Sequence, residues 1–548
     1  MKIDRRQALG LLGVGAATPV AAQAQGASFR HGVASGDPLQ DRVILWTRVT
    51  PADPARDVPV RWRVFEDQGK TRRAGHGLQM ARPDADHTVK VDVTGLKPGR
   101  DYWYEFEAGG VVSPLGRTRT LAANGDAEVA LAIASCSLYP NGYFNAYQAI
   151  ADLPKLDAVL HLGDYIYEYG GDKSYGMDSP VAAARRHDPD HEIVTLADYR
   201  RRHAQYKSDP QLQAAHARAP WIVVWDDHET TNDSFALGAQ NHQPEEGDWA
   251  GRKAVALKAY FEWMPIREPR PGQGMAEAAN RSFHFGDVAS LIMLETRLAA
   301  RDQQLNYADL GEAPTAEAVE AFRARMNDPG RKMMSAAQEA WVGEELAASV
   351  KAGRTWQVLG NQVVMARTAV PSPSGIDPEA RQKVEQVAGR LDRMERLSKL
   401  GLPYGLDMWD GYGAARDRLY GLMKAAGAHG VVVSGDSHAF WVNELWDAPE
   451  GGKRVAAEFG ATGITSPGAG DALKGIPIGR LYAERNREVV FSDQAAKGFV
   501  LLTLTSKEAK AELVAVSTIH APQFETSVLK AFATRPASGG GVEEVREV

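Results

Sequence analysis

Residues 158–168, Ala-Val-Leu-His-Leu-Gly-Asp-Tyr-Ile-Tyr-Glu, join an apolar run to a cluster of polar side chains. A short continuous apolar run is typical of a strand that is buried on both faces. The same pattern occurs three more times, at 128–137, 221–229 and 430–438. Its repetition predicts buried strands that carry chemically active side chains where they end.

Further apolar runs of the same kind lie at 289–294 and 356–359, and helix-prone stretches such as 145–151 and 336–348 separate several of the runs. Alternating strand and helix patterns predict an α/β domain, which we place at residues 127–535. In such a domain the loops at the carboxyl ends of strands carry the functional residues. We therefore expect the four polar clusters to meet at one edge of the sheet.

The first part of the chain, residues 29–121, follows a different pattern. Apolar and polar residues alternate at 42–49, 58–65 and 89–93, and Gly-Leu-Lys-Pro-Gly at 95–99 is a turn signal. About seven short strands without helical stretches indicate an all-β sandwich of immunoglobulin or fibronectin type. We expect this N-terminal domain to pack, orient or bind, because it carries little chemistry of its own.

The N-terminus predicts export. Arg5 and Arg6 precede an apolar stretch at 9–22 that is rich in Gly and Ala, and Ala-Gln-Ala at 22–24 supplies the small residues of a cleavage site. These features predict a twin-arginine signal peptide at 1–24, and hence a periplasmic or secreted protein that uses the twin-arginine export machinery. The alternative is a short anchoring or amphipathic helix. The weak hydrophobicity of the stretch and its glycines favour export.

Length and charge exclude several classes of protein. The chain has 548 residues, which is too many for one compact core. A net charge of −7 and a pI near 6.1 argue against a nucleic-acid-binding patch or an anionic membrane as partner. Beyond the N-terminus no apolar run reaches the roughly 18–20 residues of a membrane span, so we expect no transmembrane anchor. The Gly- and Glu-rich tail at 536–548 is expected to be loose.

Cys136 is the single cysteine of the chain and so has no partner for an intrachain disulfide. In an oxidising compartment a lone thiol is a hazard unless it is buried, binds a metal or acts as a nucleophile. The position of Cys136 in one of the four strand-end clusters favours a metal ligand.

The four clusters together offer a thiol, several carboxylates, a phenol and two imidazoles. Carboxylate oxygens suit hard cations, whereas thiolate, phenolate and imidazole suit iron or another transition metal, so the mixture predicts two adjacent metals. Two cations ~3.5–4 Å apart can clamp a phosphoryl group and activate water, and a nearby histidine can protonate the leaving group. Asp164 is the natural bridge between the two metals.

His161, inside a strand, and His203, in an Arg-rich helical stretch, are expected to be structural. The cluster residues are Cys136, Asp164, Tyr167, Asp227, His228, Asp436 and His438.

These clusters resemble the motifs of the metallophosphoesterase superfamily, and specifically those of the PhoD-type alkaline phosphatases. Residues 163–167 match the Gly-Asp-x-x-Tyr element that is also found in purple acid phosphatases. Residues 226–229 stand in place of Gly-Asn-His-Glu, 435–438 in place of Gly-His-x-His, and Cys136 in place of the first aspartate. These departures are typical of the PhoD-like group. The resemblance covers nearly the whole chain, from 29–38 onward, and implies an α/β/β/α sandwich with a C-terminal helix.

The resemblance also implies an iron–calcium centre. Fe3+ would be held by four side chains, Cys136, Asp164, Tyr167 and His438. Ca2+ would share Asp164 and take Asp227 and Asp436. A second Ca2+ has three candidate oxygen ligands, Asn232, Asn361 and Gln362.

Three residues are expected to act on the substrate. They are Asp227, His228 and Arg297. His228 would be the outer acid or oxyanion donor by resemblance. Arg297, at the end of an apolar run, would hold phosphate, with a surface salt bridge as the alternative. The aromatic loop at 408–412 would either cap the pocket or pack against a helix.

These expectations describe an exported metal-dependent phosphatase or phosphodiesterase. The sequence at 435–437 also spells the motif of Gly-Asp-Ser esterases, but His438 adjoins Ser437 too closely to act as a separately held base. A Cys136 nucleophile would leave the carboxylate clusters unexplained, and a non-catalytic β-sandwich binding protein would not need the intact ligand set. Phosphomonoester, phosphodiester and phospholipid substrates all fit one metal core, so the sequence leaves the substrate open.

Overall fold

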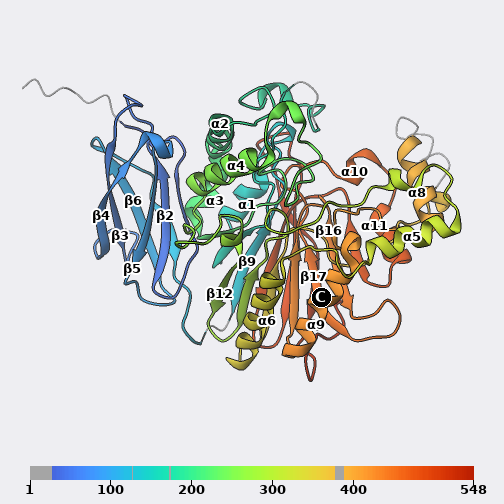
Figure 1. Ribbon diagram of the computed structural model, residues 1–548. Helices are drawn as coiled ribbons and strands as arrows, with labels where there is room; N and C mark the ends of the chain where they lie inside the picture. Colours follow the sequence, from blue (N-terminus) through green and yellow to red (C-terminus); the bar gives the residue numbers. More distant parts are fainter. Residues whose placement is uncertain (1–26, 126–127, 172–174, 377–387) are drawn as a thin grey trace, which may run out of the picture.

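The computed structural model describes residues 27–125, 128–171, 175–376 and 388–548. The predicted signal peptide at 1–24 lies outside these residues. The described chain has a β-rich part at its start, which lies at one end of the molecule, and a larger α/β part after it (Figure 1). At this level the fold class expected from the sequence is confirmed.

The β-rich part contains two sheets with a shared apolar core. Its strands are β1 (Val33–Gly36), β2 (Arg42–Arg48), β3 (Val58–Phe65), β4 (Arg73–Ala81), β5 (Thr88–Thr94), β6 (Asp101–Ala108), β7 (Val111–Val112) and β8 (Gly116–Arg119). β1, β2 and β5 pair in one sheet, and β3, β4, β6, β7 and β8 form the other. Val43, Val64 and Tyr104 are fully buried in one apolar cluster that draws on both sheets.

β1 also connects the β-rich part to the rest of the molecule. It pairs antiparallel with β2 on one side and parallel with β11 (Trp221–Val223) on the other, where Gly36 lies opposite Trp221. A Cβ at Gly36 would lie closer than 3.0 Å to the backbone oxygens of Pro265 and Trp221, so glycine permits this close approach. The boundary predicted near residue 121 therefore divides the chain but not the hydrogen-bonded sheet.

A ten-stranded sheet runs through both parts. Its other strands are β9 (Val129–Ala134), β10 (Ala158–His161), β19 (Lys497–Leu504), β20 (Ala509–Val516), β21 (Thr526–Thr534) and β22 (Arg546–Glu547). The strand order is β22-β21-β20-β19-β9-β10-β11-β1-β2-β5. β9, β10 and β11 are parallel, and every residue of these three strands is buried, as their continuous apolar runs predict.

A seven-stranded sheet packs against the first. Its strands are β12 (Arg281–Phe285), β13 (Ala289–Met293), β14 (Trp356–Gly360), β15 (Gly430–Ser434), β16 (Phe440–Trp446), β17 (Arg454–Gly460) and β18 (Val489–Asp493). β13, β14, β15 and β17 are parallel. Val358 and Val431 share one buried cluster with Leu131 of the ten-stranded sheet. Their neighbours Leu359 and Val432 belong to a second cluster, because successive side chains of a strand point to opposite faces.

Helices cover the outer faces of the two sheets. They are α1 (Asn145–Ala151), α2 (Leu196–Lys207), α3 (Pro210–Arg218), α4 (Trp249–Trp263), α5 (Ala316–Met326), α6 (Ala336–Lys351), α8 (Ala388–Leu400), α9 (Gly413–Ala426), α10 (Ala469–Ala472) and α11 (Ile478–Arg485). α1 to α4 gather beside the ten-stranded sheet (Figure 1), and α6 and α9 contribute to the cluster behind the seven-stranded sheet. Within the described ranges, every helix is too short or too polar to cross a membrane.

The C-terminal region differs from two expectations. The resemblance implies a C-terminal helix, but the described chain after α11 continues in strands, from β18 to β22. The tail at 536–548 is not loose, since Val542 and Val545 are only 2% and 4% exposed and β22 pairs with β21. The backbone N–H of Gly541 also donates to the carbonyl of Ala428 at 2.8 Å. The Gly- and Glu-rich composition of the tail suggests a loose segment, but its two buried valines hold it in place.

Candidate metal centre

Four strand ends bring the predicted clusters together. β9, β10 and β11 end a few residues before Cys136, Asp164 and Asp227, and β15 ends just before Asp436 and His438. The first three strands belong to the ten-stranded sheet, whereas β15 belongs to the seven-stranded sheet. The clusters therefore meet between the ends of two packed sheets. The expectation of one edge of a single sheet is wrong, because local patterns do not tell which strands share a sheet.

The backbone is left-handed at four of these positions. The φ angle is 62° at Cys136, 54° at Asp164, 60° at Asp436 and 56° at His438. Residues with a Cβ seldom adopt this region, and each instance costs about 1–3 kcal/mol unless its surroundings enforce it. Such residues cluster at functional sites, where the strain aims a side chain. At these four positions the left-handed backbone directs the side chains toward one shared space.

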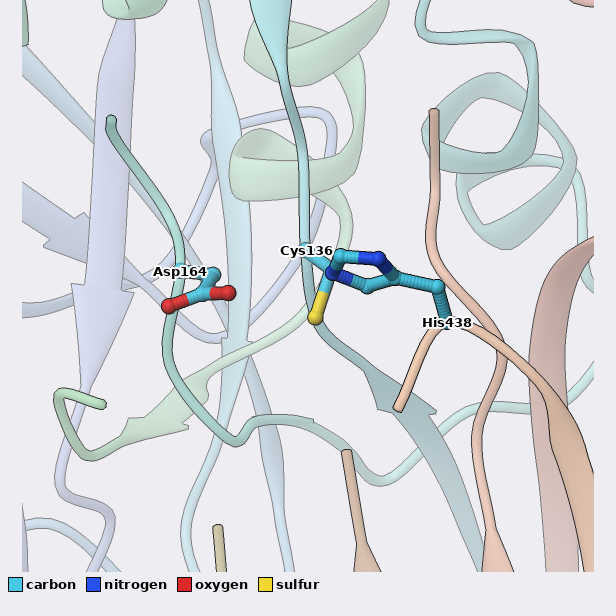
Figure 2. A group of neighbouring side chains, drawn as sticks. All are labelled: Cys136, Asp164 and His438. Atoms are coloured by element: carbon cyan, nitrogen blue, oxygen red, sulfur yellow. The ribbon is translucent and has the colours of Figure 1, made fainter. Parts of the chain in front are cut away.

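Cys136, Asp164 and His438 form a first group of donors, which converge from three separate segments (Figure 2). One donor atom from each side chain lies within 4.8 Å of the other two. The phenol of Tyr167 lies beside them, where its Oη donates to Asp164 Oδ2 at 3.0 Å and is 3.4 Å from His438 Nε2. A thiol, a phenol, an imidazole and a carboxylate together suit iron or another transition metal.

The orientation of His438 fits a metal ligand. Its Nδ1 lies 2.9 Å from the carbonyl oxygen of Pro467 and 2.8 Å from Oη of Tyr175. A proton on Nδ1 that is donated to Pro467 leaves Nε2 unprotonated on the side of Tyr167. This outer hydrogen bond is the usual way in which proteins orient a metal-binding histidine. Burial lowers the pKa of His438 to about 3, so the imidazole is neutral, as metal binding requires.

Asp164 also belongs to a second group of donors, with Asp226, Asp227 and Asp436. One oxygen from each of these carboxylates lies within 4.8 Å of the others. Within the described part of the chain, the buried Oδ1 of Asp164 has no hydrogen-bond partner. Close, buried carboxylates repel one another unless a cation neutralises them, and oxygen-only ligands suit Ca2+. The donor set therefore fits a hard cation next to the first group.

Arg297 supplies one positive charge to this second group. Its side chain is fully buried, Nε pairs with Asp226, and Nη1 lies 2.7 Å from Oδ1 of Asp407. Nη2 lies 3.8 Å from Oδ1 of both Asp227 and Asp436. The alternative of a surface salt bridge is wrong, because the loop after β13 carries the guanidinium into the interior. One guanidinium does not balance four ionised carboxylates, so the ionised group requires further positive charge.

Several pKa values respond to this concentration of buried acidic groups. Burial, together with Asp227 and Asp226, raises the pKa of Asp164 well above its ordinary value, and burial and neighbouring carboxylates do the same for Asp436. Burial and Asp164 raise the pKa of the Cys136 thiol and of the Tyr167 phenol. A bound cation would oppose all four shifts, because it stabilises the deprotonated donors.

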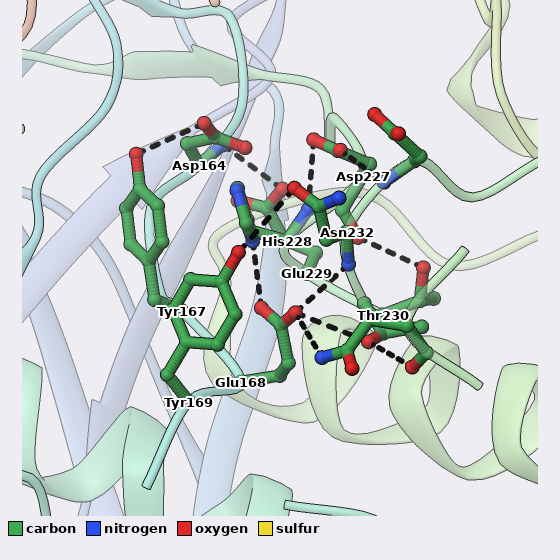
Figure 3. A network of polar contacts seen from close by, with 12 residues as sticks. Asp164, Tyr167, Glu168, Tyr169, Asp227, His228, Glu229, Thr230 and Asn232 are labelled. Carbon is green, nitrogen blue, oxygen red and sulfur yellow. Dashed lines mark hydrogen bonds and ion pairs between the residues drawn. The ribbon is translucent and has the colours of Figure 1, made fainter. Parts of the chain in front are cut away.

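His228 faces the same space and is held by Glu168 (Figure 3). The His228 Nδ1 lies 2.6 Å from Oε2 of the fully buried Glu168. The other oxygen of Glu168 accepts hydrogen bonds from the Asn232 backbone N and the Asn241 Nδ2, both at 2.9 Å. Burial opposes the charged imidazolium, but Glu168 and Asp227 raise the pKa of His228 well above its ordinary value. This histidine therefore holds a proton near neutral pH, as a general acid must.

Comparison with known proteins identifies the family. The chain matches the model of the PhoD-like phosphatases over residues 131–513, and the model of their N-terminal domain over residues 15–122. The chain belongs to the PhoD-like phosphatase family. It is 36% identical over 520 residues to alkaline phosphatase D of Bacillus subtilis (strain 168), which covers 92% of this chain and 80% of that protein. A solved structure of PhoD matches with a TM-score of 0.77 and 34% identity, over 95% of this chain and 92% of the other. This PhoD-like phosphatase is thus a phosphoric ester hydrolase.

Some residues that were considered for the site lie in the core of this PhoD-like phosphatase. The Oδ1 of Asn361 accepts from Trp409 Nε1 at 3.0 Å, and Oε1 of Gln362 accepts from Thr296, so both oxygens are engaged inside the fold. Trp409 and Tyr412 of the loop at 408–412 are fully buried and pack in the core, whereas Met408 of the same loop lines a cavity. Asn232 lies beside Asp227 and Glu168 (Figure 3) and remains a candidate oxygen ligand.

His161 and His203 have structural surroundings, as expected. The ring of His161 hydrogen-bonds to Tyr147 Oη at 2.7 Å inside β10. His203 stacks on Trp263 with ring centroids 6.3 Å apart. Neither belongs to any of the donor groups.

Ser437 does not have the surroundings of a serine nucleophile. Its Oγ accepts a hydrogen bond from Trp441 Nε1 at 2.9 Å, and the nearest imidazole along the chain, His438, is bound to Pro467. Among the described residues, no histidine hydrogen-bonds to Ser437. In the described part of the chain, Ser437 is therefore without the paired base that an esterase would need.

Three residues of the site were missed by the sequence analysis. Asp226 and Glu168 adjoin Asp227 and Tyr167 within the same clusters, so proximity in the sequence was the available signal. Ser466 follows β17 and hydrogen-bonds to Oη of Tyr167 at 2.7 Å and to the carbonyl of Cys136 at 2.8 Å. No local pattern marks Ser466, because its role depends on the fold.

Proposed function

We propose that this PhoD-like phosphatase is an exported, metal-dependent phosphatase or phosphodiesterase with an iron–calcium centre. The observation that carries the proposal is the place of Asp164, whose carboxylate is common to the thiol-containing donor group and to the carboxylate group. A carboxylate that serves two unlike donor sets at once is suited to bridge two unlike cations.

The two donor sets divide the metals by their chemistry. Fe3+ is assigned to Cys136, Asp164, Tyr167 and His438, and Ca2+ to Asp164, Asp227 and Asp436. Asp226 stays with Arg297, with which it forms a buried ion pair. When bound, the metals supply an activated water and positive charge for the phosphoryl oxygens.

The side chains around the centre perform the remaining steps. His228 donates its proton to the departing alkoxide, and Glu168 holds the imidazole by Nδ1, so that Nε2 faces the substrate. Arg297 offers Nη2 to a phosphoryl oxygen, since Nε and Nη1 are already paired with carboxylates. Asp227 accepts the backbone N–H of Asp233 at 2.6 Å, which fixes the carboxylate in the centre.

The proposal places the protein in the periplasm or outside the cell. It rests on the paired Arg5 and Arg6 and on the small-residue site at 22–24, which precede the first described strand. The twin-arginine machinery exports proteins that are already folded. This route would allow the metals to be loaded before export.

The proposal is tested on the purified exported protein. Its metals are measured by mass spectrometry, and it is assayed on a p-nitrophenyl phosphomonoester and a phosphodiester, beside Cys136→Ser. Iron and calcium in the wild type, with loss of iron and activity in Cys136→Ser, support the proposal. Tyr167→Phe should also lose any phenolate charge-transfer colour while it keeps calcium. The two assays together decide which ester class is preferred.

Three kinds of result would overturn the proposal. One is a protein free of metal, or hydrolysis that resists chelators. Another is loss of activity in Ser437→Ala with metals intact, which would favour the Gly-Asp-Ser esterase alternative. The third is the presence of metals without hydrolysis of either ester, which would point instead to a binding protein.

A further inference from the structure

A large cavity opens next to the candidate metal centre. It begins at Asp436, Ser437 and His438, extends toward α8 and α11, and has a volume of about 750 Å³. α8 and α11 lie on the same side of the molecule (Figure 1). A volume of this size is typical of sites for small organic molecules and exceeds the needs of a phosphoryl group alone. The cavity therefore has room for a sizeable alcohol part of an ester.

One wall of the cavity is aromatic and apolar. Trp441 and Tyr482 meet edge to face, with ring centroids 5.2 Å apart and an interplanar angle of 76°. Leu473 and Ile478 extend this wall, and both are almost fully buried. Tyr404 lies at the same cavity with 43% of its surface exposed, although large aromatic side chains usually find cover. Such a wall favours an apolar or aromatic ligand.

Two arginines of α8 add positive charge to the cavity. Arg390 and Arg393 are exposed, and neither makes an ion pair with a carboxylate among the described residues, although Arg393 lies over the ring of Tyr307, 5.8 Å from its centroid. Of the three lining carboxylates, Asp471 pairs with Lys497 at 2.8 Å, Asp178 is exposed to water, and Asp436 belongs to the candidate metal centre. As far as the described residues go, these exposed guanidinium groups can pair with a second anionic group on a ligand.

We propose that this cavity binds the alcohol part of the substrate, and that it selects esters whose alcohol combines an apolar or aromatic body with a second negative charge. The inference rests on the proposed function, since it places the phosphoryl group at the metal centre. Trp441 and Tyr482 contact the apolar body, and Arg390 and Arg393 pair with the charge beyond it. Esters of small aliphatic alcohols leave this surface uncovered and gain nothing from it.

The test measures binding and not turnover, so that leaving-group chemistry does not enter. Affinities of the metal-loaded protein for methylphosphonate, benzylphosphonate and (4-carboxybenzyl)phosphonate are compared by calorimetry. Benzylphosphonate should bind roughly 10–100-fold more tightly than methylphosphonate. The added carboxylate should improve affinity about two- to fivefold further. Equal affinities for all three, or no binding of any, would overturn the proposal.

Three variants assign the effects to residues. Tyr404→Ala should weaken benzylphosphonate but not methylphosphonate. The double variant Arg390→Gln, Arg393→Gln should abolish the gain from the carboxylate alone. Lys399→Gln, which changes an exposed charge of α8 outside the cavity, is the control and should retain that gain. A Tyr404 effect that is equal for both phosphonates would contradict the assignment.

Hydrolysis of p-nitrophenyl phosphate is measured in parallel. If it is intact while the phosphonates bind alike, the cavity assignment fails and the proposed function stands. If it is absent while benzylphosphonate still binds preferentially, the proposed function fails and the cavity assignment stands.

Discussion

The imidazole Nδ1 of His228 lies 2.6 Å from Oε2 of Glu168, and this ion pair is buried next to the carboxylates of the candidate metal centre. The pair keeps a protonated histidine in a place where burial alone would remove its proton. It also leaves Nε2 as the ring nitrogen that Glu168 does not bind, since Nδ1 is already engaged. In the proposed mechanism, Glu168 therefore acts through His228.

Glu168→Gln should lower kcat/KM for p-nitrophenyl phosphate about 10–100-fold, because the amide no longer holds the charged imidazole. Iron and calcium contents should not change, since Glu168 belongs to none of the donor groups. Steady-state kinetics and metal analysis check both points. Glu192→Gln, which removes a nearby carboxylate paired with Arg252 at 2.8 Å, is the control and should keep the wild-type kcat/KM.

Arg297→Met should lower the free energy of unfolding by about 3–5 kcal/mol, because it leaves buried carboxylates without their counter-charge. Urea unfolding in the presence of a chelator measures the effect. Arg418→Met removes a partly exposed pair with Glu339 and should cost at most about 1 kcal/mol. Similar losses in the two variants would show that Arg297 does not neutralise the acidic group.

Gly163→Ala should disturb the candidate metal centre, although Gly163 is not one of its donor residues. Gly163 has φ of 107°, and a Cβ there would lie closer than 3.0 Å to the backbone N of Asp226. We expect a loss of roughly 1–3 kcal/mol in unfolding free energy, together with reduced metal content. Gly421→Ala, at an exposed position in α9 with open space around it, should instead stabilise by roughly 0.5–1 kcal/mol. A Gly163→Ala protein with full metal content would contradict this account.

His203 should make the fold less stable in acid. Burial lowers its pKa from 6.5 to about 3 in the folded protein. As the pH falls below the pKa of His203 in the unfolded state, the unfolded chain binds a proton that the folded chain does not bind. Stability is therefore lost between about pH 6.5 and 3. His203→Phe removes this loss, and its unfolding free energy relative to the wild type should rise by about 1.6 kcal/mol from pH 6.5 to 5. A difference that does not change with pH would refute this explanation.

Much of the fold follows from local sequence, because strands that are buried on both faces need continuous apolar runs. The runs before Cys136, Asp164 and His438 became β9, β10 and β15, and each is entirely buried. The donors follow from the same logic, since a polar residue just past such a strand lies at the rim of the sheet.

The remainder depends on contacts that no local pattern contains. The assignment of β15 to a second sheet is set by its pairing with β14 and β17. The buried position of Arg297 does not follow from its sequence neighbours, which do not reveal Asp226 and Asp407 as its partners inside the fold. Local patterns also do not reveal that Arg390 and Arg393 of α8 line a cavity, because a helix that is only solvated and one that lines a cavity have the same local composition.

The ten-stranded sheet has a consequence for how the protein comes into being. β9 lies between β10 and β19, and Leu131 pairs with Leu502, about 370 residues later in the chain. A ribosome that adds about 5–20 residues per second delivers β19 roughly 20–75 s after β9. During that interval the strand that leads to Cys136 has one exposed edge, open to pairing with other chains. The nascent protein therefore cannot close its central sheet until synthesis is nearly complete, and a chaperone that shields this edge should raise the yield of active enzyme.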